Sequence, residues 1–300
     1  MITLNQVRFL YDQTPVVRDV SLHVPKGSIF GFAGPNGAGK TTTLKLILGL
    51  LQPDTGSIRI RNLDLAHHRK EVLSKTGSLI ETPSLYPHLT AAENLEISRR
   101  VYRVPVSRID EVLSLTGIHA AKHKKVKAFS LGMKQRLGIA LALLHEPDLL
   151  ILDEPINGLD PGGILEFRDL LKSLVEEKGM TVLISSHILS ELELVITHAG
   201  IISEGTIRFH GTMADLQSLS RSRLILEVSD PSSAAEMIGK ITPCFSDQSR
   251  LIIPEGSREM AAHLVRELTA AGQSVYQVVA DKPNLESVFH ELIRKDPEHV

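Results

Sequence analysis

The feature of this sequence that most restricts its fold is a glycine-rich segment between an apolar strand and an apolar helix. The segment matches the pattern G-x-x-x-x-G-K-[ST] and reads Gly34, Pro35, Asn36, Gly37, Ala38, Gly39, Lys40 and Thr41. Residues 28–33 are typical of a strand, and residues 41–51 are typical of a helix. Glycines let backbone N–H groups turn inward around phosphates, and the helix N-terminus adds the positive end of its dipole. We therefore predict a phosphate-binding loop in an α/β fold.

The last residues of this segment carry the groups that a nucleoside triphosphate and its metal require. Lys40 supplies a point charge to the β- and γ-phosphates, so we expect it to take part in catalysis as well as in binding. The Thr41 hydroxyl can take a Mg²⁺ position, and Thr42 belongs to the same nucleotide-binding set. The predicted cofactors are thus a nucleoside triphosphate and Mg²⁺.

A second motif consists of an apolar run followed by two acids. Residues 149–152 are Leu-Leu-Ile-Leu, as expected of a parallel strand buried on both faces, and Asp153 and Glu154 follow. Ligands of open α/β sheets bind at the carboxyl ends of strands, so we expect Asp153 to hold the magnesium. Glu154 is placed to accept a proton from an attacking water. The two motifs alone would suit a GTPase, a kinase or any P-loop ATPase.

Residues 129–137 narrow this choice. They read Phe-Ser-Leu-Gly-Met-Lys-Gln-Arg-Leu and precede a helix predicted over residues 134–144, so Ser130 and Gly132 stand where a helix N-terminus can meet an anion. The segment resembles the signature sequence of ABC (ATP-binding cassette) ATPases, which usually begins Leu-Ser-Gly-Gly. Phe129 and Leu131 depart from that form, whereas Ser130 and Gly132 are kept. The resemblance implies that the nucleotide is ATP.

Further residues resemble ABC landmarks in the expected order. Tyr11 stands where the family stacks an aromatic ring on adenine, and Asp160 ends a segment similar to the loop that crosses the interface between two cassettes. His187 matches the histidine that reaches the γ-phosphate. The resemblance implies that the phosphate loop of one cassette faces the signature segment of another, with ATP between them, in a homodimer or a heterodimer.

The chain is expected to contain two domains. Residues 1–219 resemble an ABC cassette with a mixed sheet, an antiparallel β subdomain and a helical subdomain over about residues 90–146. Within it, residues 189–196 are expected to form a helix. From residue 220 to 300 the expected order β-α-β-β-α-β-α, with a strand at residues 241–245, is typical of a split β-α-β module. We therefore predict a small α+β accessory domain at the C-terminus.

Glu81 follows a predicted strand at residues 76–80, where most ABC members place a glutamine that contacts Mg²⁺, the attacking water and the membrane partner. Glutamate at this place resembles the subgroup that exports bacitracin and lantibiotic peptides. The C-terminal module, with residues 284–289 at its end, resembles the domain appended to ABC-2-type drug exporters. These resemblances imply the ATPase subunit of an exporter, with Glu81 in a catalytic and metal-binding role.

Other classes remain open at this point. A general drug, lipid or polysaccharide exporter would share the same motifs. Glu81 and the C-terminal ending disfavour a nutrient importer. Soluble ABC ATPases of translation or DNA maintenance usually carry two cassettes or a long coiled-coil insertion, and neither is evident here.

Composition limits the partners. With 33 Lys and Arg against 35 Asp and Glu the net charge is −2, so we expect no nucleic-acid binding. The single cysteine, Cys244, cannot form an intrachain disulfide, which fits a reducing compartment. No apolar run approaches the ~20 residues of a bilayer span. We therefore expect a peripheral location on the cytoplasmic face of the membrane, bound to integral membrane permease subunits.

Overall fold

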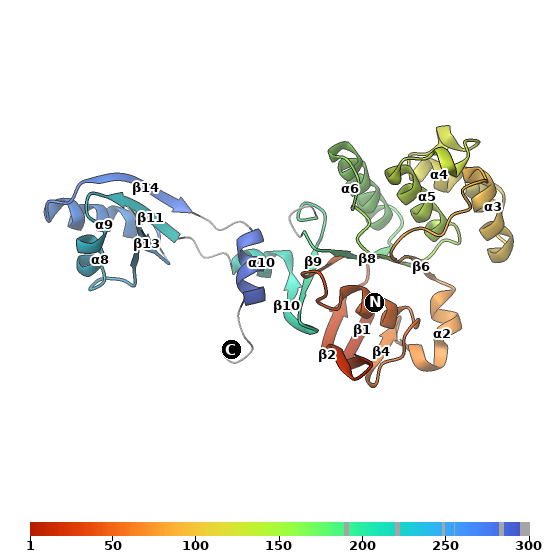
Figure 1. Ribbon diagram of the computed structural model, residues 1–300, viewed down its shortest axis with the longest axis horizontal. Helices are drawn as coiled ribbons and strands as arrows, with labels where there is room; N and C mark the ends of the chain where they lie inside the picture. The colour runs from red at the N-terminus through yellow and green to blue at the C-terminus, as the bar shows by residue number, and fades with distance from the viewer. Residues whose placement is uncertain (189–191, 220–222, 248–249, 255, 282–284, 295–300) are drawn as a thin grey trace. The chain divides into compact units, whose positions relative to one another are not determined.

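The computed structural model describes residues 1–300 except 189–191, 220–222, 248–249, 255, 282–284 and 295–300 (Figure 1). It divides into two units. The first contains Met1–Met213 and the end of the last helix, and the second is Ala214–Glu291. The division falls after the first residue of α7 (Met213–Ser218), whereas the sequence suggested a boundary after residue 219.

A six-stranded sheet forms the centre of the first unit. Its strand order is β10-β9-β3-β8-β7-β6, and only the pairing of β10 with β9 is antiparallel. The strands are β3 (Ile29–Ala33), β6 (Thr76–Leu79), β7 (Leu149–Leu152), β8 (Thr181–Ser186), β9 (His198–Ser203) and β10 (Thr206–Thr212). Every residue of β3, β7 and β8 is buried, as their continuous apolar sequences predict.

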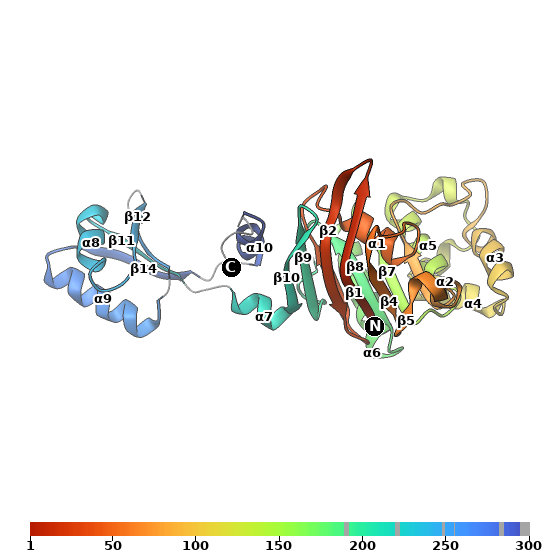
Figure 2. The same ribbon diagram turned by 90° about the horizontal axis from the view of Figure 1, so that it is seen from below.

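A second, antiparallel sheet packs on the first and shares its core (Figure 2). Its order is β2-β1-β4-β5. The strands are β1 (Ile2–Tyr11), β2 (Thr14–Val24), β4 (Thr55–Ile60) and β5 (Leu63–Asp64). Leu44, Leu46 and Ile47 of α1 (Lys40–Ile47) join this core. Helix α2 (Leu65–Leu73) follows, with the Asp64 carboxylate capping its N-terminus, and the sequence analysis did not predict this helix.

The expected helical subdomain is present. It contains α3 (Ala91–Tyr102), α4 (Ser107–Leu115), two short 3₁₀ turns and α5 (Leu131–Leu143), which Figure 1 shows gathered at one end of the central sheet. A reciprocal pair of hydrogen bonds between Thr90 and Glu93 caps α3. Helix α5 begins at Leu131 and not at residue 134 as predicted, because the Ser130 hydroxyl accepts from the Met133 N–H and caps it.

One predicted helix of the cassette differs in the structure. Of residues 189–196, the first three lie outside the described residues, and residues 192–195 form turns. In these turns the N–H groups of Val195 and Ile196 both donate to the carbonyl oxygen of Leu192. Helix α6 (Pro161–Glu176) is the next helix after the apolar strand β7 and is capped by Asp160.

The second unit contains a four-stranded antiparallel sheet of order β12-β13-β11-β14. The strands are β11 (Arg223–Val228), β12 (Phe245–Asp247), β13 (Arg250–Ile253) and β14 (Val275–Asp281). The helices are α8 (Pro231–Ile238), α9 (Arg258–Ala270) and α10 (Leu285–Arg294), of which α10 belongs to this unit up to Glu291. The strand predicted at residues 241–245 instead begins at Phe245, because Ile241 and Thr242 bond back to Ile238 and extend the turn after α8. Leucines and isoleucines of β11, β13, α8 and α9 form a core of its own.

Candidate functional site

The glycine-rich loop joins β3 to α1 along a path that only glycine can follow at two places. A Cβ on Gly34 would lie 2.3 Å from the carbonyl oxygen of Ile202, and a Cβ on Gly39 would lie 2.8 Å from that of Val16. Gly39 also has a φ of 102°, in the left-handed region. Backbone packing against β9 and β2 therefore shapes a cradle at the N-terminus of α1 that fits phosphate groups.

Lys40 lies inside this cradle and is only 6% exposed. Its Nζ donates to the carbonyl oxygen of Gly34 at 2.8 Å and to that of Pro35 at 3.3 Å. The same Nζ lies 3.2 Å from Glu154 Oε1. The structure thus brings the ammonium group and the proposed proton acceptor together. Thr42 follows in the first turn of α1 and is half-buried.

Thr41, in the first turn of α1, and Asp153, directly after β7, meet. Thr41 Oγ1 donates to Asp153 Oδ2 at 2.8 Å, and the Asp153 residue is 4% exposed. Ser185 Oγ donates to the other carboxylate oxygen, Oδ1, at 2.6 Å. Hydroxyl and carboxylate oxygens are the hard ligands that Mg²⁺ prefers, so this pair fits the ion that the sequence predicts.

Hydrogen bonds hold both the backbone and the carboxylate of Glu154 in place. Its φ of 48° is unusual for a residue with a side chain, and its N–H donates to Ser185 Oγ at 2.9 Å. Glu154 Oε2 lies 2.7 Å from His187 Nδ1 and accepts from the His187 N–H at 3.3 Å. The carboxylate therefore lies between His187 and Lys40. These two contacts fix the position of a group that is proposed to take a proton from water.

Two residues that were not predicted from the sequence contact the site residues described above. Ser185, at the end of β8, bridges the backbone of Glu154 and the carboxylate of Asp153. A polar residue that ends an apolar strand was the only available signal. Lys45, one turn after Thr41 in α1, donates from Nζ to Glu81 Oε1 at 2.8 Å.

Glu81 therefore pairs with Lys45 in this structure. No contact joins Glu81 to Thr41 or Asp153 within the part of the chain that the structure describes. The Glu81 carboxylate is 62% exposed, and its φ is 60°. The hydrogen bond and the charge of Glu81 raise the pKa of Lys45. A catalytic or metal-binding role for Glu81 stays a prediction.

Tyr11 ends β1 and is 45% exposed. Its ring packs edge-on against Phe9, with ring centroids 4.8 Å apart. The exposed face of the ring can stack on a base beside the phosphate loop.

The signature segment and the Asp160 loop contact each other. A Cβ on Gly132 would lie 3.2 Å from Leu159, and a Cβ on Gly158 would lie 2.4 Å from Leu131. The Asp160 carboxylate accepts from the Gly163 N–H at 2.9 Å and caps α6. Among the described residues, no contact joins Ser130, Gly132 or Asp160 to the phosphate loop.

Comparisons with known proteins agree with this geometry. The family model described as ABC transporter matches residues 17–157, and a model described as AAA domain, putative AbiEii toxin, Type IV TA system, matches residues 125–193. A bacitracin transport ATP-binding protein of Enterococcus faecalis is 40% identical over 286 residues, which cover 94% of this chain and 93% of the relative. A lantibiotic transport ATP-binding protein of Streptococcus pyogenes is 40% identical over 230 residues, 76% of this chain and 99% of the relative.

Solved structures show the same fold. The ATP-binding subunit of an ABC transporter is 31% identical, with a TM-score of 0.66 over 73% of this chain and 92% of that one. A dimeric bacterial ABC transporter cassette is 26% identical, with a TM-score of 0.65 over 71% of this chain and 99% of that one. Among the residues that the structure describes, none of the helices has the length and apolar character needed to span a bilayer.

Proposed function

This chain belongs to the ABC transporter ATP-binding family and hydrolyses ATP to drive transport, and from that premise we propose that its cargo is an antimicrobial peptide of the bacitracin or lantibiotic class. The observation that carries the proposal is the extent of the similarity to a bacitracin transport protein. That similarity covers 94% of this chain and so extends from the cassette into the C-terminal unit. Glu81, in place of the usual glutamine, supports the same assignment.

Within the cassette we propose these roles. Glu154 accepts a proton from the water that attacks the γ-phosphate, and His187, 2.7 Å away, keeps the carboxylate in place. Lys40 binds the phosphates and stabilises the negative charge that develops on them. Thr41 and Asp153 would hold Mg²⁺, which when bound neutralises phosphate charge. Glu81 and its partner Lys45 lie at the edge of this site.

We propose that the working site requires two cassettes. Ser130 and Gly132 begin α5 but make no contact with the phosphate loop of their own chain, among the residues described. A second copy or a related cassette would bring its own signature segment to the ATP, and a relative of the same fold has been solved as a dimer. Gly132→Asp would place a carboxylate beside the γ-phosphate, so we expect ATP binding to persist and ATP-driven dimerisation to fail.

Light scattering with and without MgATP measures this effect. Gly162→Asp is the matched control, because a Cβ at Gly162 meets nothing within 4 Å. Intact dimerisation of Gly132→Asp would contradict the composite site.

We further propose that integral membrane permease subunits bind the cassette at the cytoplasmic face of the membrane. The loop after β6, which contains Glu81 and the exposed Tyr86, is the surface expected to meet them. A carboxylate there can pair with a basic residue of the permease. Co-purification from membranes checks this partnership, because the full chain should retain an integral membrane protein.

Peptide susceptibility tests the cargo. In a strain that lacks this chain, the wild type should restore growth against bacitracin or a lantibiotic, and Glu154→Gln should not. Glu81→Gln should keep most ATPase activity but protect the cells less well. Lys45→Met is the matched control, because it breaks the Lys45–Glu81 pair and leaves the carboxylate intact.

Two results would change these assignments. If no peptide distinguishes the wild type from the deletion strain, the cargo is a general drug or lipid instead. If Glu81→Gln abolishes phosphate release by the purified complex, the carboxylate is catalytic and its proposed contact with the permease is not needed to explain the loss.

A further inference from the structure

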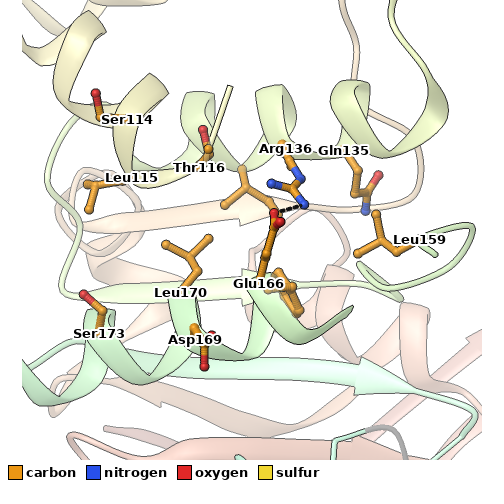
Figure 3. A pocket seen from close by; sticks show the side chains of 13 residues that line it. Ser114, Leu115, Thr116, Gln135, Arg136, Leu159, Glu166, Asp169, Leu170 and Ser173 are labelled. Atoms are coloured by element: carbon orange, nitrogen blue, oxygen red, sulfur yellow. Dashed lines mark ion pairs between the residues drawn. The ribbon is translucent and has the colours of Figure 1, made fainter. Parts of the chain in front are cut away.

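A cavity of about 350 Å³ lies in the first unit between the C-terminal end of α4, helix α5 and helix α6 (Figure 3). Its walls are mainly apolar and include Leu115, Ile139, Leu159, Phe167 and Leu170. No residue of the phosphate loop lines it. The cavity is therefore separate from the ATP site described above.

Gln135 gives this cavity a polar group. The residue is 7% exposed, and its side chain extends from α5 toward α6 and lines the cavity (Figure 3). Within the described part of the chain, its carboxamide has no hydrogen-bond partner. The carboxamide carries both a donor and an acceptor, so a ligand in the cavity that offers an acceptor and a donor can pair with both of its groups.

The charges around the cavity favour a neutral ligand. Arg136 on α5 and Glu166 on α6 form an ion pair, with Nη2 and Oε2 2.5 Å apart, so each neutralises the other (Figure 3). Asp169 also lines the cavity, but its carboxylate is directed away from α5 in the same view. A charged ligand would lose its hydration among apolar walls without gaining a free partner of opposite charge.

We propose that this cavity binds a small neutral molecule with an apolar body and one amide-like group. The amide pairs with the carboxamide of Gln135, which has a matching donor and acceptor, and the body packs on Ile139, Phe167 and Leu170. The molecule contacts both α5 and α6, the helices that Ser130 and Asp160 cap. Its presence therefore opposes movement of the signature helix relative to the Asp160 loop.

Benzamide is a suitable probe because it has a ring and a primary amide. The experiment titrates benzamide into the full chain without nucleotide and follows the δ1 methyl group of Ile139 by NMR. We expect a saturable shift of this methyl signal. Leu170→Trp, which fills the cavity, should abolish the shift, and Lys172→Ala, on the same helix but outside the lining, should leave it unchanged.

Gln135→Leu tests the polar contact. This variant should bind benzamide about tenfold more weakly and should bind ethylbenzene, which has no hydrogen-bonding group, at least as well as the wild type does. Circular dichroism checks that each variant folds, and Leu115→Phe replaces Leu170→Trp if the latter does not.

Three results would each overturn the proposal. They are the absence of a saturable shift, a shift that survives filling of the cavity, and unchanged benzamide affinity in Gln135→Leu. Because the measurement needs no ATP and no transport, its failure would leave the proposed export function unaffected.

Discussion

The two units of this chain bury their sheets in different ways. In the cassette, β3, β7 and β8 are buried at every position. In the C-terminal unit, β11 alternates between buried and half-buried residues, because α8 and α9 supply the core of one face only. A parallel sheet covered on both faces has room for polar side chains only at its ends, whereas a half-covered sheet presents a whole face.

This difference explains where the chemistry is found. The proposed catalytic cluster lies at the carboxyl ends of β3, β7 and β8, at Lys40, Asp153, Glu154, Ser185 and His187. On the uncovered face of the C-terminal sheet the pairing register instead aligns an apolar row across all four strands, Phe245, Ile252, Ile225 and Val279. The covered sheet of the cassette thus gathers reactive groups at the ends of its strands, and the half-covered sheet of the C-terminal unit presents an extended apolar surface.

The largest expected change in the free energy of unfolding comes from truncating a buried isoleucine of the cassette sheet, compared with a half-buried one of the C-terminal sheet. Ile184 in β8 is fully buried, so Ile184→Ala should lower the free energy of unfolding by about 2–5 kcal/mol. Ile225, on the uncovered face of β11, is half-buried, and Ile225→Ala should cost less than about 1.5 kcal/mol. Urea unfolding followed by circular dichroism compares them. Equal losses would show that the uncovered face is packed in solution.

Substitution of one glutamate in each unit tests where the chemistry lies. Glu154→Gln keeps the shape of the side chain but removes the proton acceptor, so phosphate release should fall by about 10²-fold or more while ATP binding persists. Glu227→Gln, in β11, should leave turnover unchanged. Wild-type turnover in Glu154→Gln would refute the role proposed for this carboxylate.

A smaller, pH-dependent effect is expected at His145. The residue is buried in the cassette and stacks on Tyr102 with ring centroids 4.3 Å apart, and burial lowers its pKa below the ordinary value of 6.5. The unfolded chain therefore binds this proton more readily than the folded chain. Stability from neutral His145 is present above pH 6.5 and is lost as the pH falls below 6.5 toward the folded pKa.

Urea unfolding between pH 7 and pH 5 measures this loss. His145→Phe should reduce the pH dependence of stability, and His263→Phe, which changes a half-exposed histidine of α9, should not. An unchanged slope in His145→Phe would show that other groups cause the acid sensitivity.

The smallest effect is expected from removing all residues after α7. The two units have separate cores, so a chain that ends at Ser218 should fold and bind ATP with an affinity within about threefold of the full chain. Calorimetric titration with ATP compares the two chains. Aggregation of the shortened chain would mean that the cassette depends on the missing part.

The sequence predicted those parts of the site that are adjacent in the chain. Residues 34–41 form one local structure, and Asp153 and Glu154 directly follow an apolar strand, so pattern and spacing were sufficient. The resemblance to ABC ATPases added Ser130 and His187 as site residues. These residues lie in the structure at the start of α5 and beside Glu154, respectively.

The contacts that the sequence did not predict depend on the tertiary fold. Ser185 reaches Asp153 because β8 lies beside β7. Neither segment's sequence determines the strand order of the sheet, so this contact could not be predicted. Lys45 and Glu81 are 36 residues apart in the chain. In the C-terminal unit, hydrogen bonds of Ile241 and Thr242 to Ile238 outweigh the strand propensity of residues 241–244.

The place of β3 in the sheet also affects synthesis on the ribosome. This strand, Ile-Phe-Gly-Phe-Ala, pairs with β8 on one side and with β9 on the other, and both are made after residue 180. Translation of the roughly 150 intervening residues takes about 8–30 s at ordinary elongation rates. During this time an entirely apolar strand has neither neighbour, so the nascent chain is expected to need protection from aggregation. The phosphate loop that follows β3 is therefore among the first parts of the cassette to be synthesised and among the last to take its final shape.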